Sequence, residues 1–253
     1  MAVKSPYKEI LFSKLLYRIF GANDTKPGQA YDLWAKEYDN QDGNLMLALD
    51  ETVFSGLLDE IDIKDKCVLD IGCGTGRHWG KILDKRPRLL AGYDVSEKML
   101  EMLRQKFPDA VTNILHQNKV SETANNTIDT IISTLTIAHI EKIDEAFAEW
   151  NRVLKPGGHI IITDYHPMAL IKGGKRTFMH NGKTVSVKNF VHSIDELTSI
   201  AGQLQWQRIR LTERSVDESV KHFYENKNAI SVYESFTGVP VIYGILFKKT
   251  DVT

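Results

Sequence analysis

The amino-acid sequence predicts an α/β protein built on a doubly wound, Rossmann-like sheet, with an N-terminal helical cap and a β-hairpin insertion. Two observations predict this fold. Short apolar, β-branched runs alternate with amphipathic helical segments between residues 66 and 164, which is typical of parallel strands covered by helices on both faces. A glycine-rich turn also follows the first run. We divide the 253-residue chain into a cap or lid at 1–45 and a main domain at 46–253, with an insertion at 165–193.

The central region supplies five predicted strands, at 67–71, 89–93, 111–115, 128–133 and 159–163. Ser96 is placed to cap the helix that follows the second strand. Phe147 and Trp150 lie on the apolar face of a strongly amphipathic helix. The segment Lys155-Pro156-Gly157-Gly158 ends this helix, because proline cannot continue it and glycine frees the turn.

The pattern changes after Asp164. Residues 177–190 predict a hairpin around Asn181-Gly182, a pair that favours a type I′ turn. A helix is expected at 193–201, with Ser193 as its N-cap. The runs at 206–211 and 239–247 predict two late strands, which could form an antiparallel hairpin at the sheet edge.

Composition limits the classes of partner. A formal net charge of −1 gives no general attraction to polyanions, so no nucleic-acid partner is expected. The two cysteines, Cys67 and Cys73, form no disulfide framework. We find neither a membrane-spanning run nor a signal peptide, and we expect a cytoplasmic protein. The basic and apolar segment at 7–20 could lie on a membrane, but we favour a helix packed on the domain.

The glycine turn carries the main functional signal. Gly72, Gly74 and Gly76 follow a strand and precede a helix, where the backbone turns sharply and approaches a ligand. In a dinucleotide fingerprint the third glycine would come one place later, where Arg77 stands. Asp70 would repel a pyrophosphate and suits a positively charged ligand. The alternative is a turn that merely packs the helix on the strand.

Asp94 is the second candidate ligand-binding residue. It closes the second strand, 18 residues beyond Gly76. A carboxylate in this place can accept hydrogen bonds from both ribose hydroxyls of a nucleoside. The alternative is a helix N-cap, and the glycine turn upstream favours ribose binding.

Together these segments resemble a known family. The runs at 70–76 (Asp-Ile-Gly-Cys-Gly-Thr-Gly), 92–96 (Gly-Tyr-Asp-Val-Ser) and 154–158 (Leu-Lys-Pro-Gly-Gly) resemble the successive motifs of class I S-adenosylmethionine-dependent methyltransferases, of the small-molecule, type 11-like kind. The resemblance covers residues 31–164. It implies a seven-stranded, mostly parallel sheet with an antiparallel final strand. It also implies S-adenosylmethionine as the methyl donor and S-adenosylhomocysteine as the product.

The resemblance also implies where the cofactor binds. The glycines would shape the methionine pocket, Asp94 would bind the ribose, and the residues after the third strand would hold adenine. Thr134 and Leu135 would back the methionine moiety, and two tyrosines would close over the cofactor unless they only pack the cap. The implied cofactor residues are Tyr31, Tyr38, Asp70, Gly72, Gly74, Gly76, Asp94, Val95, Met99, Gln117, Asn118, Thr134 and Leu135.

The methyl acceptor is less well defined. His139 and His166 follow the fourth and fifth strands, at the sheet edge where ligands bind, and are the candidate catalytic residues. Either could instead be structural. No Asn/Asp-Pro-Pro-aromatic motif follows the fourth strand, and no cysteine nucleophile lies beyond residue 73. We therefore expect a small-molecule acceptor and no metal. The insertion would line its pocket or form a dimer contact, which leaves a homodimer open.

Two other functions stay open at this point. A nicotinamide-dependent oxidoreductase uses a related sheet, but the early third glycine and Asp70 count against it. A non-catalytic S-adenosylmethionine-binding protein would keep the same pocket without turnover.

Overall fold

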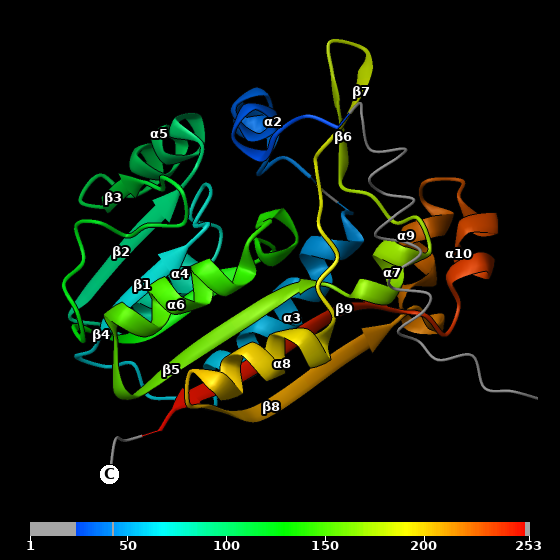
Figure 1. Ribbon diagram of the computed structural model, residues 1–253. Helices are drawn as coiled ribbons and strands as arrows, with labels where there is room; N and C mark the ends of the chain where they lie inside the picture. Colours follow the sequence, from blue (N-terminus) through cyan, green and yellow to red (C-terminus); the bar gives the residue numbers. More distant parts are fainter. Residues whose placement is uncertain (1–23, 42, 251–253) are drawn as a thin grey trace, which may run out of the picture.

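The computed structural model describes residues 24–41 and 43–250, and it shows a seven-stranded sheet with helices on both faces (Figure 1). The order of the strands is β3-β2-β1-β4-β5-β9-β8. Their bounds are β1 Cys67–Ile71, β2 Leu89–Asp94, β3 Val111–Ile114, β4 Ile128–Thr134, β5 Leu154–Tyr165, β8 Trp206–Ser215 and β9 Pro240–Lys249. The segment at 7–20 lies outside the described residues.

The strand directions confirm the predicted Rossmann-like fold. The pairs β1–β2, β1–β4, β2–β3 and β4–β5 are parallel, whereas β9 runs antiparallel to both β5 and β8. The final strand is therefore inserted inside the sheet, and β8 forms the edge. The two late strands pair as an antiparallel hairpin, as expected, but only β8 lies at the edge.

Two helical layers follow from the alternation of side chains along the strands. Val68 of β1 points to the layer that holds α3, α4 and α5, and Leu69 points to the layer that holds α6 and α8. Residues with exposed fractions of 0–2%, such as Phe54, Trp79, Phe147 and Trp150, fill the two cores. The bounds are α3 Leu45–Leu58, α4 Trp79–Asp84, α5 Glu97–Lys106, α6 Ile143–Val153 and α8 Ile194–Gln203.

The predicted helix ends have local causes in the sequence. The Ser96 hydroxyl accepts a hydrogen bond from the Met99 backbone N–H at 3.2 Å, and Ser193 forms a capping box with Glu196 at the start of α8. Helix α6 ends at Val153, and β5 begins at the next residue, so the proline-glycine segment lies within the strand's bounds. Strand β5 thus starts earlier than predicted.

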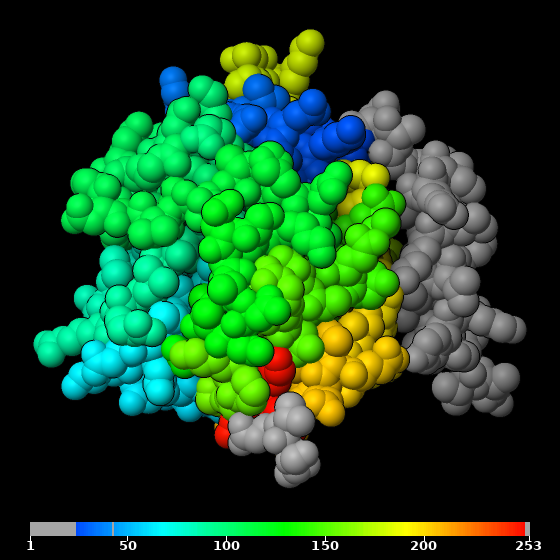
Figure 2. All heavy atoms as spheres, turned by 60° about the vertical axis from the view of Figure 1, so that its left-hand side comes forward, coloured from blue at the N-terminus to red at the C-terminus, as the bar shows by residue number. Residues whose placement is uncertain are grey.

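The cap and the insertion form one unit over the carboxyl end of the parallel strands. The cap consists of α2 (Pro27–Trp34) and η1 (Ala35–Glu37), and the insertion carries the hairpin β6 (Thr177–His180) and β7 (Lys183–Ser186). Asn181 and Gly182 have φ of 49° and 73°, as the predicted turn requires. Trp34 stacks on Phe178 with ring centroids 4.4 Å apart. In the space-filling view the cap (blue) lies against the green central region, with the hairpin standing above it (Figure 2).

The remaining short elements lie toward the edge of the sheet where the parallel strands end and β9 begins. They are η2 Ile137–His139 after β4, and α7 Pro167–Ile171, η3 Glu218–Val220, α9 Lys221–Glu225 and α10 Ile230–Phe236. Val220, Tyr233 and Val241 belong to a small apolar cluster of their own there. Within residues 24–41 and 43–250, no helix combines the length and the apolar character needed to span a bilayer.

Candidate active site

A cavity of about 240 Å³ lies at the carboxyl ends of β1, β2 and β4. The strand order reverses between β1 and β4, and doubly wound sheets bind ligands at such a point. The cap closes the cavity from above. Its lining residues are Pro27, Gly28, Tyr31, Tyr38, Gly72, Gly74, Asp94, Val95, Met99, Leu115, Asn118, Thr134, Leu135, Thr136, His139 and Ile140.

The structure brings most of the predicted cofactor residues together around this cavity. Ten of the thirteen line it: Tyr31, Tyr38, Gly72, Gly74, Asp94, Val95, Met99, Asn118, Thr134 and Leu135. Asp70, Gly76 and Gln117 do not line it. Of the two candidate catalytic histidines, His139 lines the cavity and His166 does not.

The three glycines of the turn are needed for two different reasons. All have positive φ, at 75°, 53° and 72°. A Cβ on Gly72 would overlap the Thr136 side chain, and a Cβ on Gly76 would press on Leu103 at 3.0 Å. A Cβ on Gly74 would meet no heavy atom within 4 Å, and this residue lines the cavity. Gly74 alone therefore leaves space for a ligand, while the other two permit close packing.

Asp94 holds the glycine turn as well as facing the cavity. Its Oδ2 accepts a hydrogen bond from the Gly74 N–H at 2.8 Å, and its Oδ1 accepts one from the Ser96 N–H at 2.9 Å. Each carboxylate oxygen has a further lone pair for a hydroxyl. Burial raises the pKa of Asp94 to about 6.

Asp70 lies behind the turn instead of in the cavity wall. Its Oδ2 accepts a hydrogen bond from the Trp79 indole N–H at 2.9 Å, and its side chain is 4% exposed. Burial raises its pKa to about 6, and its Oδ1 has no hydrogen-bond partner among the described residues. Asp70 was expected to contact the cofactor directly, but it lies behind the pocket as a buried hydrogen-bond acceptor.

The residues after β3 divide between the cavity and the solvent. Gln117 and Asn118 both have positive φ, at 50° and 60°, in a tight turn closed by a bridge between His116 and Lys119. This turn places Asn118 in the cavity wall, next to the apolar Met99 and Leu115, and leaves Gln117 exposed. Only one of the two amides is therefore positioned to meet an adenine edge.

The neighbours of the turn anchor it to α3. Arg77, which stands where a dinucleotide fingerprint has glycine, forms an ion pair with the buried Asp50. His78 Nε2 lies 2.9 Å from the same carboxylate. His78 is therefore part of the support behind the turn, consistent with its place at the start of α4.

His139 is held as a neutral ring with a defined tautomer. Its Nδ1 lies 2.9 Å from the Lys188 carbonyl oxygen, so Nδ1 carries the proton and Nε2 is an acceptor. Nε2 lies 2.9 Å from the Tyr31 hydroxyl and 2.7 Å from Nη1 of Arg176. Burial and the adjacent guanidinium lower the pKa of His139 to about 3.

Arg176 does not line the cavity, but it contacts the lining residues Tyr31, Leu135 and His139, and the sequence interpretation missed it. Its side chain is 5% exposed, and its Nη1 donates to the Leu135 carbonyl and the Tyr31 hydroxyl, both at 2.6 Å. The basic pair Lys175-Arg176 before the hairpin was the only sequence signal for it. Nothing local to that pair indicates that one of its side chains reaches the end of β4.

His166 has a different environment. Its Nδ1 accepts a hydrogen bond from the Met168 N–H at 3.1 Å and so caps α7, while its Nε2 lies 2.7 Å from Glu213 of β8. Both ring nitrogens are thus engaged away from the cavity. The structure does not bring this candidate catalytic residue to the other site residues.

Polar contacts fix the cap over the cavity. The Ser96 hydroxyl donates to Asp32 of α2 at 2.6 Å, and the Thr75 hydroxyl donates to Asp39 at 2.6 Å. Tyr31 and Tyr38 point to the cavity from this cap, and burial raises the pKa of both hydroxyls. In the part of the chain that the structure describes, no group of three or more His, Cys, Asp or Glu is placed to hold a metal ion.

Comparison with known proteins shows what the central region of the chain is similar to. Residues 69–162 match the family model described as "Methyltransferase domain". This part of the chain is similar to methyltransferase domains that use S-adenosylmethionine, as the sequence motifs imply.

One curated relative of this methyltransferase domain is the biotin biosynthesis bifunctional protein BioHC of Cellvibrio japonicus, 29% identical over 178 residues. That match covers 69% of this chain but only 34% of the relative, so the chain spans about a third of its length. A solved S-adenosylmethionine-dependent methyltransferase from Mesorhizobium loti aligns with a TM-score of 0.60 at 16% identity, covering 77% of this chain and 96% of that one. The [4+2]-cyclase SpnF aligns with a TM-score of 0.64 at 16% identity, covering 90% and 97%.

The cavity of the methyltransferase domain fits S-adenosylmethionine on three observations. Behind the cavity wall, Asp70 keeps a buried oxygen that has no partner among the described residues. Gly74 leaves open space, and Asp94 offers lone pairs at the cavity wall. A nucleoside with positively charged groups suits such a set of acceptors.

Proposed function

We propose that this protein is an S-adenosylmethionine-dependent methyltransferase that acts on a small-molecule acceptor. The observation that carries the proposal is the cavity in which Gly74, Asp94 and the end of β4 meet at the reversal of strand order. The matched domain, residues 69–162, supplies the whole of this constellation except the cap.

Each part of the cavity has a distinct task in this proposal. The Asp94 carboxylate accepts the ribose hydroxyls, and Asn118 pairs with the adenine edge between apolar neighbours. Thr134 and Leu135 back the methionine moiety. When bound, S-adenosylmethionine supplies an electrophilic methyl group. The chain's own contribution is alignment and exclusion of water, which can account for most of the rate of an in-line displacement.

The cap and the insertion enclose the acceptor side. We propose that residues 1–45 act as a lid on the main domain, because the described part of this segment lies over the cavity. Tyr31 and His139 face the acceptor in this arrangement and are proposed to position it. No catalytic task is proposed for His166, since both its ring nitrogens are engaged elsewhere.

Calorimetric titration with S-adenosylhomocysteine and, separately, with NADH tests the cofactor assignment. We expect binding of S-adenosylhomocysteine alone. Asp94→Ala should weaken that binding more than tenfold, because two ribose hydroxyls lose their acceptor. The exposed Asp109→Ala is the matched control, since it removes a carboxylate in the turn between α5 and β3, outside the cavity. Binding of NADH alone would contradict the proposal.

A turnover assay separates an enzyme from a cofactor-binding protein without activity. A metabolite extract is incubated with labelled S-adenosylmethionine, and labelled small molecules and S-adenosylhomocysteine are quantified. We expect both to accumulate with time and with enzyme concentration. Cofactor binding without any transfer would support the non-catalytic alternative.

A further inference from the structure

The guanidinium of Arg176 lies over a different part of the sheet from Gly74 and from Asp94, the proposed ribose-binding residue. Gly74 and Asp94 follow β1 and β2, whereas Arg176 contacts Leu135 and His139 after β4 and faces Asp164 of β5. In the strand order β2-β1-β4-β5, Arg176 therefore belongs to the side away from the ribose. The insertion supplies Arg176 to this side, and the cap reaches it with the Tyr31 hydroxyl, 2.6 Å from Nη1 of Arg176.

The donors of Arg176 are only partly used. Its Nη1 lies within 2.7 Å of three acceptors, but its Nη2 is buried and has no hydrogen-bond partner among the described residues. The nearest carboxylate, Asp164, has its Oδ1 at 3.7 Å from Nη2. Both Asp164 oxygens already accept backbone hydrogen bonds, from Ala138 at 2.7 Å and from Tyr165 at 2.6 Å. A buried cationic donor in this state is suited to a further anionic acceptor.

Among the described residues, the imidazole of His139 in this cluster is not free to accept a proton. The His139 Nε2 lone pair faces the N–H of Arg176 and the hydroxyl of Tyr31, and the His139 Nδ1 proton is bound to the Lys188 carbonyl. A reacting alcohol or ammonium group would need to give up a proton here, and an adjacent guanidinium opposes a protonated imidazole. A carboxylate oxygen is already ionised at neutral pH and needs no base.

We propose that the acceptor is a small molecule bearing a carboxylate, that Arg176 binds this carboxylate, and that one of its oxygens is methylated. This proposal rests on the proposed methyltransferase function. A carboxylate oxygen attacks the methyl carbon of the sulfonium donor, and the carbon–sulfur bond breaks with its electron pair going to sulfur. The products are a methyl ester and a neutral thioether, and no proton is released.

The chemical test uses the lability of methyl esters. The protein is incubated with methyl-labelled S-adenosylmethionine and a fractionated metabolite extract, and the products are treated with mild alkali. We expect most of the transferred label to be released as volatile methanol. Arg176→Met should lower this base-labile transfer more than tenfold, and Arg176→Lys should restore only part of it, because lysine lacks the planar fork. Base-stable transfer, or an undiminished rate in Arg176→Met, would overturn the proposal.

A binding test needs no turnover. The probes are straight-chain carboxylates from acetate to octanoate and their primary amides, added to the protein saturated with S-adenosylhomocysteine. We expect the carboxylates, and not the amides, to shift the guanidinium NMR signals of Arg176. Lys175→Met is the matched control, because it removes a neighbouring charge whose side chain is 48% exposed. If no probe shifts these signals and no base-labile product forms, the proposal is wrong.

The two proposals fail in distinguishable ways. Absence of S-adenosylhomocysteine binding in the wild type would contradict the proposed function itself. Intact S-adenosylhomocysteine binding with methylation of an amine or alcohol would contradict only the carboxylate assignment. Arg176→Met is checked by its thermal unfolding and by its S-adenosylhomocysteine affinity, which should stay within about threefold of the wild type. If that variant does not fold, Arg176→Lys and the carboxylate probes decide.

Discussion

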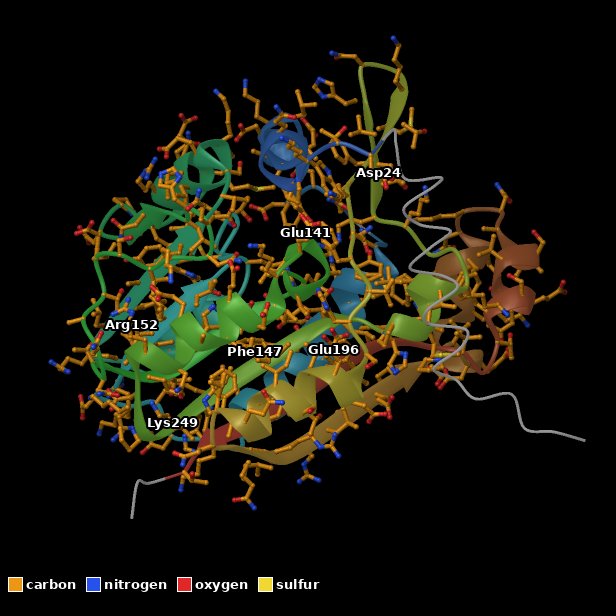
Figure 3. All side chains as sticks on the ribbon, in the orientation of Figure 1. Asp24, Glu141, Phe147, Arg152, Glu196 and Lys249 are labelled. Atoms are coloured by element: carbon orange, nitrogen blue, oxygen red, sulfur yellow. The ribbon has the colours of Figure 1, made fainter. Side chains whose placement is uncertain are left out.

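Two buried cations, Lys249 and Arg176, show how the two ends of the sheet differ. The Lys249 ammonium donates to the carbonyls of Asn151 and Leu154 at 2.8 and 2.9 Å, where α6 ends and β5 begins. Figure 3 labels Lys249 at the lower left of the view and Asp24 at the upper right, near the hairpin. Arg176, at the cavity end, keeps a buried nitrogen without a partner among the described residues. The buried Lys249 ammonium therefore stabilises the fold and has no role in binding. The buried Arg176 guanidinium keeps a donor that, in our proposal, binds a ligand.

At the cavity end, substitutions in the glycine turn should have the largest effects, and they should separate stability from ligand binding. Gly72→Ala should lower the free energy of unfolding by about 3 kcal/mol, because its methyl group would overlap Thr136 at a positive φ. Gly74→Ala should cost only about 1 kcal/mol of backbone strain, since nothing lies within 4 Å of the added carbon. It should nevertheless lose S-adenosylhomocysteine affinity, because the methyl group enters the cavity. Urea unfolding measures the stability of each variant, and calorimetry measures its affinity for S-adenosylhomocysteine. Equal losses of stability in Gly72→Ala and Gly74→Ala would contradict the different roles assigned to these two glycines.

At the Lys249 end, a substitution should affect stability alone. Lys249→Met keeps the apolar stem but leaves two carbonyl oxygens without their donor, which should cost about 1–3 kcal/mol in urea unfolding. The affinity for S-adenosylhomocysteine should not change. Lys248→Met is the control, because the neighbouring Lys248 is exposed. A change of cofactor affinity in Lys249→Met would show that the two ends are coupled.

The sequence predicted those features of the fold and of the candidate site that depend on local patterns of residues. The proximity of the glycine turn and Asp94 could be inferred because they follow successive buried strands, and doubly wound sheets bring such ends together. It did not show that Asp70 would lie behind the turn, because that depends on how Trp79 packs. Arg176 and the engagement of His166 with Glu213 were also out of reach, since both result from contacts between distant segments. Periodicity carries no information on which distant segments meet.

Acidic pH should weaken cofactor binding at the Asp94 end. Burial raises the pKa of Asp94 to about 6, and the ionised form is the better acceptor for two ribose hydroxyls. Affinity should therefore rise as pH rises through 6, and at pH 5 it should be about tenfold lower than at pH 7. Calorimetry in buffers of different ionisation enthalpy should also detect proton release on binding near pH 6. In Asp94→Asn the affinity should be lower and nearly independent of pH in this range.

The smallest effect concerns the protonation of His139. Its pKa is lowered to about 3, first by burial and then by Arg176, so the ring should stay neutral from pH 5 to pH 8. Ring ¹⁵N NMR should show a single tautomer protonated at Nδ1, as the contact with the Lys188 carbonyl requires. Arg176→Met should raise this pKa, because it removes the neighbouring cation, but burial should still hold it below the ordinary histidine value. The exposed His222 offers an internal reference. Titration of His139 near pH 6.5 in the wild type would mean that this ring can accept a proton from the substrate. An alcohol or an amine would then be a possible methyl acceptor, and the argument for a carboxylate would fail.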